Sequence, residues 1–246
     1  MKVKILLFGI LILFLSINGL AQNNSVNVTS KKVKYERKGK DLPEHKKTFE
    51  VNYPNFSGIK NPTVLRNLEH TVSYWKIFDT TLEENLGDYY WLENFDYKVK
   101  YNKNSLMVIE LMMEGSGAYP DTSIKTFVIN LNTGKRIFIR DVFNDVGQLL
   151  VKVDKAQKAE VKKYLADMKK ENSEDLSTAV ELIANKKYTA NTLDEYYIDD
   201  KGVTFLFDYG FVHAVKALEP EGKYFFTWAE LKPLIKRGGL LGRFAH

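Results

Sequence analysis

Residues 106–140 read LMVIELMMEGSGAYPDTSIKTFVINLNTGKRIFIR, and this stretch decides the fold. Two apolar segments, Leu106–Met113 and Ser123–Leu131, flank a glycine-containing loop at Glu114–Asp121. In the first segment apolar residues occupy every odd position, whereas the even face carries Glu110 and, just beyond the segment, Glu114; this is typical of a strand with one fully buried face. An Asn-Thr-Gly-Lys turn then leads to Arg136–Arg140. The stretch predicts a meander of three antiparallel strands.

The first residues of the chain have the features of a secretory signal peptide. Lys2 and Lys4 precede an apolar segment, Ile5–Leu15, and Gly19–Ala21 fits a cleavage site. We expect cleavage after Ala21 and a location outside the cytoplasm, periplasmic or secreted, with no membrane span left after cleavage. The alternative is an uncleaved anchor, but the apolar segment is short for a full span.

The composition limits the class of protein. Of the 246 residues 44% are hydrophobic and 13% aromatic, which is enough for a packed core. The formal net charge is +5, and it falls to +3 when Lys2 and Lys4 are removed. So small an excess of positive charge does not predict nucleic acid as a partner. The chain has no cysteine, so its stability has to come from the core.

The remaining patterns alternate between strand and helix. Alternation predicts strands at 33–37, 47–53 and 91–101, and Asn61-Pro62 marks the start of a helix over 62–77. Further helices are expected within 143–170, where an interruption remains open, and at 175–184 and 228–235. Further strands are expected at 195–198, 203–209 and 224–227.

This order of elements predicts an α+β fold with antiparallel sheet meanders, helices packed on one face, and two halves of similar size. The expected parts are a signal peptide (1–21), a flexible lead-in (22–32), an N-terminal β-α-β half (33–121), a C-terminal half (122–235) and a frayed tail (236–246).

Catalytic and cofactor motifs are not recognised in the sequence. The four histidines are scattered without ligand spacing, so neither a metal site nor a cofactor is expected. Glu110 and Glu114 share one strand face and come nearest to an acid pair, but a glycosidase pair normally needs two elements that flank the bond. We therefore expect a non-enzymatic protein. The alternative is an envelope glycan hydrolase with Glu110 or Glu114 as its acid.

Two loops combine glycine, aromatic and polar residues. They are either turns that only shape the sheet ends or a rim for a sugar or protein ligand, because aromatic rings beside hydrogen-bonding groups suit both kinds of ligand. The predicted ligand-binding residues are Gly115, Ser116, Gly117 and Tyr119 on the first loop, and Asp208, Tyr209 and His213 on the second.

Several motifs resemble those of the RsiV-type extracytoplasmic domain family. They are Gly117-Ala118-Tyr119-Pro120, FVINLNTGK at 127–135, Asp141-Val142-Phe143, GVTFLFDY at 202–209 and FTWAEL at 226–231. The resemblance extends over residues 33–235 and depends on the order of these motifs. In that family the domain occurs in an anti-sigma factor that binds lysozyme, and beside the catalytic domain of a peptidoglycan deacetylase.

The chain also departs from this family. Tyr119 stands where the family usually has histidine, and Ser116 replaces a glycine. Neither a sigma-binding segment nor a deacetylase domain is recognised, so those two activities are not implied. The resemblance implies a binding domain for a cell-envelope ligand, either a peptidoglycan-type glycan or a lysozyme-like protein.

Overall fold

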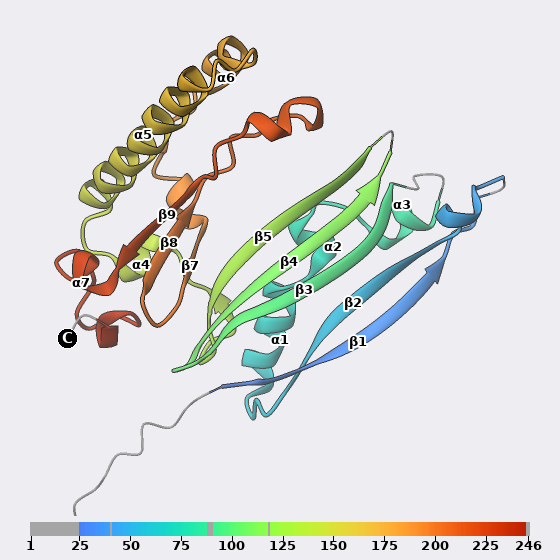
Figure 1. The fold of residues 1–246 in the computed structure, drawn as a ribbon. Helices are drawn as coiled ribbons and strands as arrows, with labels where there is room; N and C mark the ends of the chain where they lie inside the picture. Colours follow the sequence, from blue (N-terminus) through green and yellow to red (C-terminus); the bar gives the residue numbers. More distant parts are fainter. Residues whose placement is uncertain (1–24, 40, 88–90, 118, 245–246) are drawn as a thin grey trace, which may run out of the picture.

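The computed structural model describes residues 25–39, 41–87, 91–117 and 119–244 (Figure 1). It shows the expected α+β fold, with a six-stranded sheet in the order β1 to β6 and a three-stranded sheet in the order β7 to β9. The predicted signal peptide lies outside the described residues. The strands of the larger sheet are β1 (Asn27–Glu36), β2 (Thr48–Ser57), β3 (Leu92–Lys103), β4 (Leu106–Ser116), β5 (Pro120–Asn130) and β6 (Lys135–Arg136).

Strand β4 occupies the middle of the molecule because both of its faces are apolar where it begins. Met107 and Ile109 are fully buried in the core beneath the N-terminal helices, and Leu106 and Val108 are fully buried in the core of the C-terminal half. Strand pairing in this sheet is antiparallel except between β2 and β3, which are parallel. A parallel pair needs a crossover connection, and here helices provide it.

These crossover helices cover one face of the larger sheet (Figure 1). They are α1 (Pro62–Thr71), α2 (Tyr74–Ile77) and α3 (Leu82–Leu86). As predicted, Asn61 caps α1, and its side chain accepts a 2.9 Å hydrogen bond from the Thr63 amide. The single helix expected over 62–77 is wrong, because Ser73 is extended. That break turns Tyr74 inward, where its ring stacks on Phe95 at 4.7 Å.

The C-terminal half packs a long helix and a small sheet together. The helix α5 (Val146–Lys170) is uninterrupted, and Asp145 caps its first turn through a 2.9 Å bond from the Gln148 amide. The other elements of this half are α4 (Ile139–Val142), α6 (Leu176–Ile183), β7 (Tyr196–Ile198), β8 (Gly202–Leu206), β9 (Lys223–Thr227) and α7 (Trp228–Leu231). Short 3-10 helices are η1 (Glu44–Lys46), η2 (Thr192–Asp194), η3 (His213–Leu218) and η4 (Gly242–Phe244).

Residues 27–32 and 236–244 are more ordered than predicted. Residues 27–32 of the expected flexible lead-in belong to β1, which pairs with β2 along its whole length. The expected frayed tail also packs: Leu241 is fully buried, and the ring of Phe244 stacks on Trp228 at 4.3 Å. Apolar side chains that reach the core order these segments despite their polar neighbours.

The meander is confirmed, but its third strand is short. The strand expected over Arg136–Arg140 is replaced by the two-residue β6 and then α4, where the amide of Phe138 donates to Asp141 Oδ2 at 2.9 Å. The loop expected at Glu114–Asp121 is mostly strand, because β4 and β5 pair as far as Ser116 and Pro120. The boundary expected between the two halves, after residue 121, therefore falls inside the β4–β5 hairpin. The larger sheet continues to β6, and the strands after it belong to the smaller sheet.

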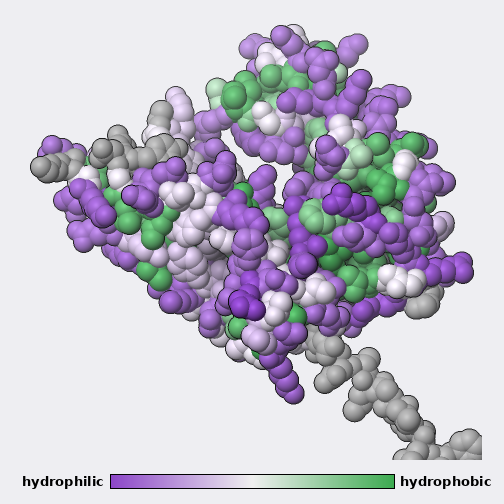
Figure 2. All heavy atoms as spheres, turned by 180° about the vertical axis from the view of Figure 1, so that it is seen from behind, coloured by the Kyte–Doolittle hydropathy of each residue, from purple (hydrophilic) through white to green (hydrophobic). Residues whose placement is uncertain are grey.

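No helix within the described ranges is both long and apolar enough to cross a membrane. Figure 2 shows the face opposite to that of Figure 1, where hydrophilic side chains predominate and hydrophobic ones form patches between them.

Candidate ligand-binding site

The structure brings the two predicted loops together through one aromatic contact. Tyr119 lies at the end of the β4–β5 hairpin, and His213 is the first residue of η3. Their rings stack with centroids 4.9 Å apart and planes 18° from parallel. Tyr119 keeps 65% of its surface exposed, and His213 is exposed as well. We call Gly117, Tyr119, Asp208 and His213, all of them exposed, the rim.

Charged groups adjoin the rim. Asp208 Oδ1 accepts a 2.8 Å bond from the Gly210 amide and lies 3.9 Å from Lys216 Nζ. Burial opposes the charge of Lys216, but the hydrogen bond and charge of Glu219, followed by the charges of Asp208 and Asp121, outweigh it and raise the pKa of Lys216. This lysine is therefore a positive charge that η3 places beside the rim.

A cleft of about 520 Å³ runs between one face of β5 and the C-terminal half. Its apolar lining includes Ile124, Tyr197 and Phe207. Carboxylates of the cleft form ion pairs with lysines. Lys100 Nζ lies 3.2 Å from Glu110 Oε1, and Lys223 Nζ lies 3.3 Å from Glu221 Oε1. The cleft thus offers an apolar strip between paired charges, an arrangement suited to binding a polar ligand without a large net charge.

Three predicted residues do not contribute contacts to the rim, and Tyr209 is the clearest correction. It is fully buried, and its hydroxyl lies 3.0 Å from the hydroxyl of Tyr224 and donates to Glu160 Oε2 at 3.1 Å. Burial, the largest cause, raises the pKa of Tyr209 to about 12. Its ring packs in the core between Phe207 and Phe211, so it supports the rim from below.

Gly115 and Ser116 hold the hairpin to the N-terminal half. A Cβ at Gly115 would lie 2.4 Å from the carbonyl oxygen of Trp91, so only glycine fits there. The Ser116 hydroxyl contacts Glu93 and accepts a 2.6 Å bond from Lys46 Nζ. Lys46 is buried and also bridges to Glu93 at 2.5 Å. Nothing in the local sequence around Lys46 predicts this burial, because it depends on contacts across 47 and 70 residues.

The two candidate acids lie in different surroundings. Glu110 lines the cleft and is ion-paired with Lys100, whereas Glu114 is exposed and accepts a 3.5 Å hydrogen bond from Asn94. Glu195 and Glu219, from the C-terminal half, also line the cleft. Within the described residues, no group of histidine, aspartate and glutamate side chains is arranged to hold a metal ion.

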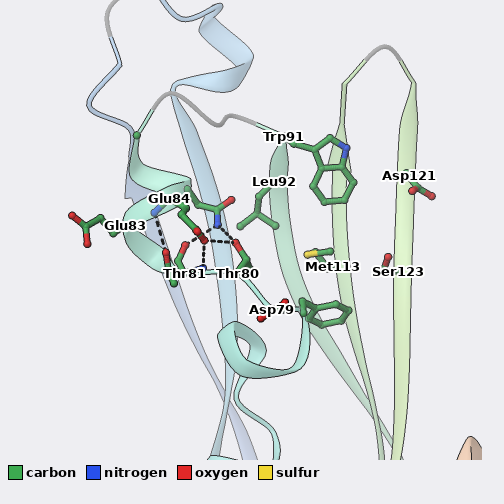
Figure 3. A pocket seen from close by; sticks show the side chains of 13 residues that line it. Asp79, Thr80, Thr81, Glu83, Glu84, Trp91, Leu92, Met113, Asp121 and Ser123 are labelled. Carbon is green, nitrogen blue, oxygen red and sulfur yellow. Dashed lines mark hydrogen bonds between the residues drawn. The ribbon is translucent and has the colours of Figure 1, made fainter. Parts of the chain in front are cut away.

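A larger pocket, of about 980 Å³, lies on the other face of the hairpin, beside α3 (Figure 3). Trp91 and Phe78 are among its lining residues. Sequence reasoning missed this pocket, since Trp91 was assigned only to the alternating face of a strand. The available signal was the tryptophan at the first position of the strand predicted over 91–101.

Comparison with known proteins gives a likeness of fold. No family model and no curated protein matches the chain. A solved DUF3298 family member from Bacteroides fragilis aligns with a TM-score of 0.54 at 12% identity, covering 91% of this chain and 99% of that one. A DUF3298 family protein from Pseudomonas aeruginosa aligns with a TM-score of 0.52 at 14% identity, covering 87% and 96%. DUF3298 is the RsiV-type domain family. The chain therefore shares the fold of DUF3298 proteins over most of its length.

Proposed function

We propose that this protein is a non-enzymatic, extracytoplasmic binding domain that recognises a cell-envelope ligand at the rim. The observation that carries the proposal is the Tyr119–His213 stack, which joins the two predicted loops at an exposed surface. The location outside the cytoplasm rests on the expected signal peptide. The fold shared with DUF3298 proteins is consistent with the proposal but names no ligand.

The surroundings of the rim favour a protein over a glycan as its partner. Tyr119 and Val212 are 65% and 69% exposed, and the charged side chains of Asp208 and Lys216 lie near them. Exposed tyrosine surrounded by apolar and charged side chains is typical of the energetic centre of a protein interface. A lysozyme-like protein is thus the first partner to test, and a peptidoglycan-type glycan is the second.

The test measures retention of the chain without its expected signal peptide on immobilised lysozyme and on purified peptidoglycan, at low and moderate salt. Specific recognition should persist at moderate salt, whereas a nonspecific charge contact weakens as salt screens it. We expect Tyr119→Ala and His213→Ala to weaken binding by about tenfold or more, as loss of an interface hot spot does. Phe225→Ala is the matched control, because Phe225 is an exposed aromatic, 48% accessible, on β9.

Two results would contradict the proposal. One is that neither support retains the protein. The other is that the two rim variants bind as well as the Phe225→Ala control does. Retention on peptidoglycan but not on lysozyme, if it is lost in Tyr119→Ala and His213→Ala, would move the proposal from a protein to a glycan ligand at the same residues.

A hydrolase remains the second candidate because Glu110 lines the same cleft as Glu195 and Glu219. A general acid has to deliver a proton, and the ion pair with Lys100 makes Glu110 a charge partner instead. We therefore expect no release of soluble fragments from peptidoglycan. Release by the wild type that is lost in Glu110→Gln would establish the hydrolase in place of the binding domain.

A further inference from the structure

The pocket beside α3 has two walls of opposite character (Figure 3). Its apolar wall consists of Phe78, Trp91, Leu92 and Met113. The opposite wall is polar and comes from the turn before α3 and from α3 itself, through Asp79, Thr80, Thr81, Glu83, Glu84 and Asn85. The volume of about 980 Å³ is at the upper end of the range of small-molecule sites, and such a pocket has room for more than one ring of a ligand.

Trp91 is held in place by backbone contacts. Its carbonyl oxygen accepts a 3.0 Å hydrogen bond from the Ser116 amide, and its indole lies directly against Gly115, where a Cβ would be 2.5 Å from ring atom Cε3. The side chain is half-buried and lines the pocket. Within the part of the chain that the structure describes, its indole N–H has no hydrogen-bond partner. A fixed aromatic ring is therefore presented to the pocket.

The polar wall is fixed by a capping box. The Thr81 amide donates to Glu84 Oε2 at 2.7 Å, and the Glu84 amide donates to Thr81 Oγ1 at 3.1 Å. Asn85 Nδ2 ties Thr80 Oγ1 into the same network at 2.8 Å (Figure 3). The hydrogen bond from the Thr81 amide lowers the pKa of Glu84, so this wall holds an ionised acceptor.

Asp79 completes the polar wall at its lower edge in Figure 3. Its carboxylate is exposed and forms no ion pair with any described residue. The backbone of Asp79 is left-handed, with φ at +49°. Aspartate and asparagine tolerate this conformation better than most residues, so the carboxylate can be altered here without changing the turn.

The charge of the lining selects the ligand. Among the described residues, the ionisable groups that line the pocket are all acidic, namely Asp79, Glu83, Glu84 and Asp121. Phosphate and carboxylate ligands would be repelled. The two walls instead require a ligand with one apolar face and edges rich in hydrogen-bond donors. A pyranose ring has this form, because its C–H groups pack on an aromatic ring while its hydroxyls donate to acceptors.

We propose that this pocket is a second binding site, which takes pyranose units of a neutral or amino sugar against Trp91, with Asp79 accepting a hydrogen bond from a sugar hydroxyl or amino group. The site adjoins the rim at Gly117, which lies near Trp91 Cδ1, but it does not include the stacked rings of Tyr119 and His213. Along β5, Asp121 and Ser123 line this pocket, whereas Thr122 and Ile124 line the cleft on the opposite face. Sugar binding here does not require Tyr119 or His213.

The experiment titrates the chain without its expected signal peptide with three probes, namely triacetylchitotriose, cellotriose and chitosan trimer, by calorimetry and saturation-transfer NMR. At least one trimer should bind. We expect Trp91→Ala to weaken its binding by tenfold or more and Asp79→Asn by severalfold, with Tyr119→Ala unchanged. Trp91→Phe, which keeps an aromatic face but loses the indole donor, should bind between the wild type and Trp91→Ala.

Folding is monitored by thermal denaturation, and Asp79→Asn keeps the proposal testable if Trp91→Ala is unstable. The proposal is overturned if none of the trimers binds at concentrations up to about 10 mM. It is also overturned if a folded Asp79→Asn protein binds as the wild type does. Loss of trimer binding in Tyr119→Ala would assign the sugar to the rim instead. Because lysozyme retention reports on the rim and trimer binding on this pocket, the two proposals fail independently.

Discussion

Trp91 lies so close to Gly115 that a single methyl group at position 115 would be 2.4 Å from the Trp91 carbonyl oxygen and 2.5 Å from its indole ring. This contact connects the two faces of the hairpin. On one side it orients the indole toward the pocket beside α3, and on the other it holds the strand that ends at the rim. A glycine predicted to shape a ligand loop therefore has its main role in packing.

Gly115→Ala should destabilise the protein by about 1–3 kcal/mol, because β4 or Trp91 has to move to make room for the methyl group. Gly117→Ala is the control, since its Cβ would be 3.7 Å from Trp91, an ordinary contact distance. Urea denaturation measures both free energies of unfolding. Equal free energies of unfolding for the two variants would show that the close contact between position 115 and Trp91 does not destabilise Gly115→Ala.

The Tyr119–His213 stack should couple the hairpin to η3 by about 0.5 kcal/mol, the lower end of the range for aromatic pairs, because Tyr119 is largely exposed. A double-mutant cycle with Tyr119→Ala, His213→Ala and the double variant measures this coupling free energy. Additive effects on the free energy of unfolding would mean that the contact contributes no stability.

The Glu93 carboxylate should make stability depend on acidity. The hydrogen bond from Lys46, followed by that from Ser116, lowers the pKa of Glu93 from its ordinary 4.5. In the unfolded chain these partners are lost, so the stabilisation is present above about pH 4.5 and disappears as the pH falls through the lower pKa of the folded state. Glu93→Gln should therefore destabilise the protein at neutral pH and have a smaller effect at pH 3.

Urea denaturation at several pH values measures this difference, with Glu36→Gln as the control. Glu36 is exposed and forms no ion pair among the residues that the structure describes. A difference between Glu93→Gln and the wild type that stays constant from neutral to acidic pH would contradict the linkage.

Tyr224→Phe should cost about 1.5–3 kcal/mol, the range for a hydrogen bond to a charged group. The Tyr224 hydroxyl donates to Glu160 Oε2 at 2.6 Å, within a network that includes Tyr209 and the Gly222 amide. Tyr197→Phe is the matched control, because the Tyr197 ring is half-buried and its hydroxyl has no hydrogen-bond partner among the described residues. Thermal denaturation of both variants decides the point: equal melting temperatures would show that the network contributes little.

Local sequence signals were sufficient for much of the fold. The two-residue alternation along β4 and β5 follows from side chains that point to opposite faces of a strand, and Asn61 with Pro62 satisfies the unpaired amides at the start of a helix. These effects act over a few residues. The α+β class and the presence of most elements were therefore predictable, whereas the break at Ser73 was not, since it depends on where Tyr74 packs.

The candidate site shows where sequence reasoning ends. Glycine, aromatic and polar residues in two loops identified Tyr119 and His213, but only the tertiary structure decided that their rings meet and that Tyr209 is buried. It also decided that Phe244 packs on Trp228 and that Trp91 lines a pocket. Burial and contact between distant residues depend on how whole elements pack, because the apolar area that each residue loses to its neighbours is a property of the assembled core.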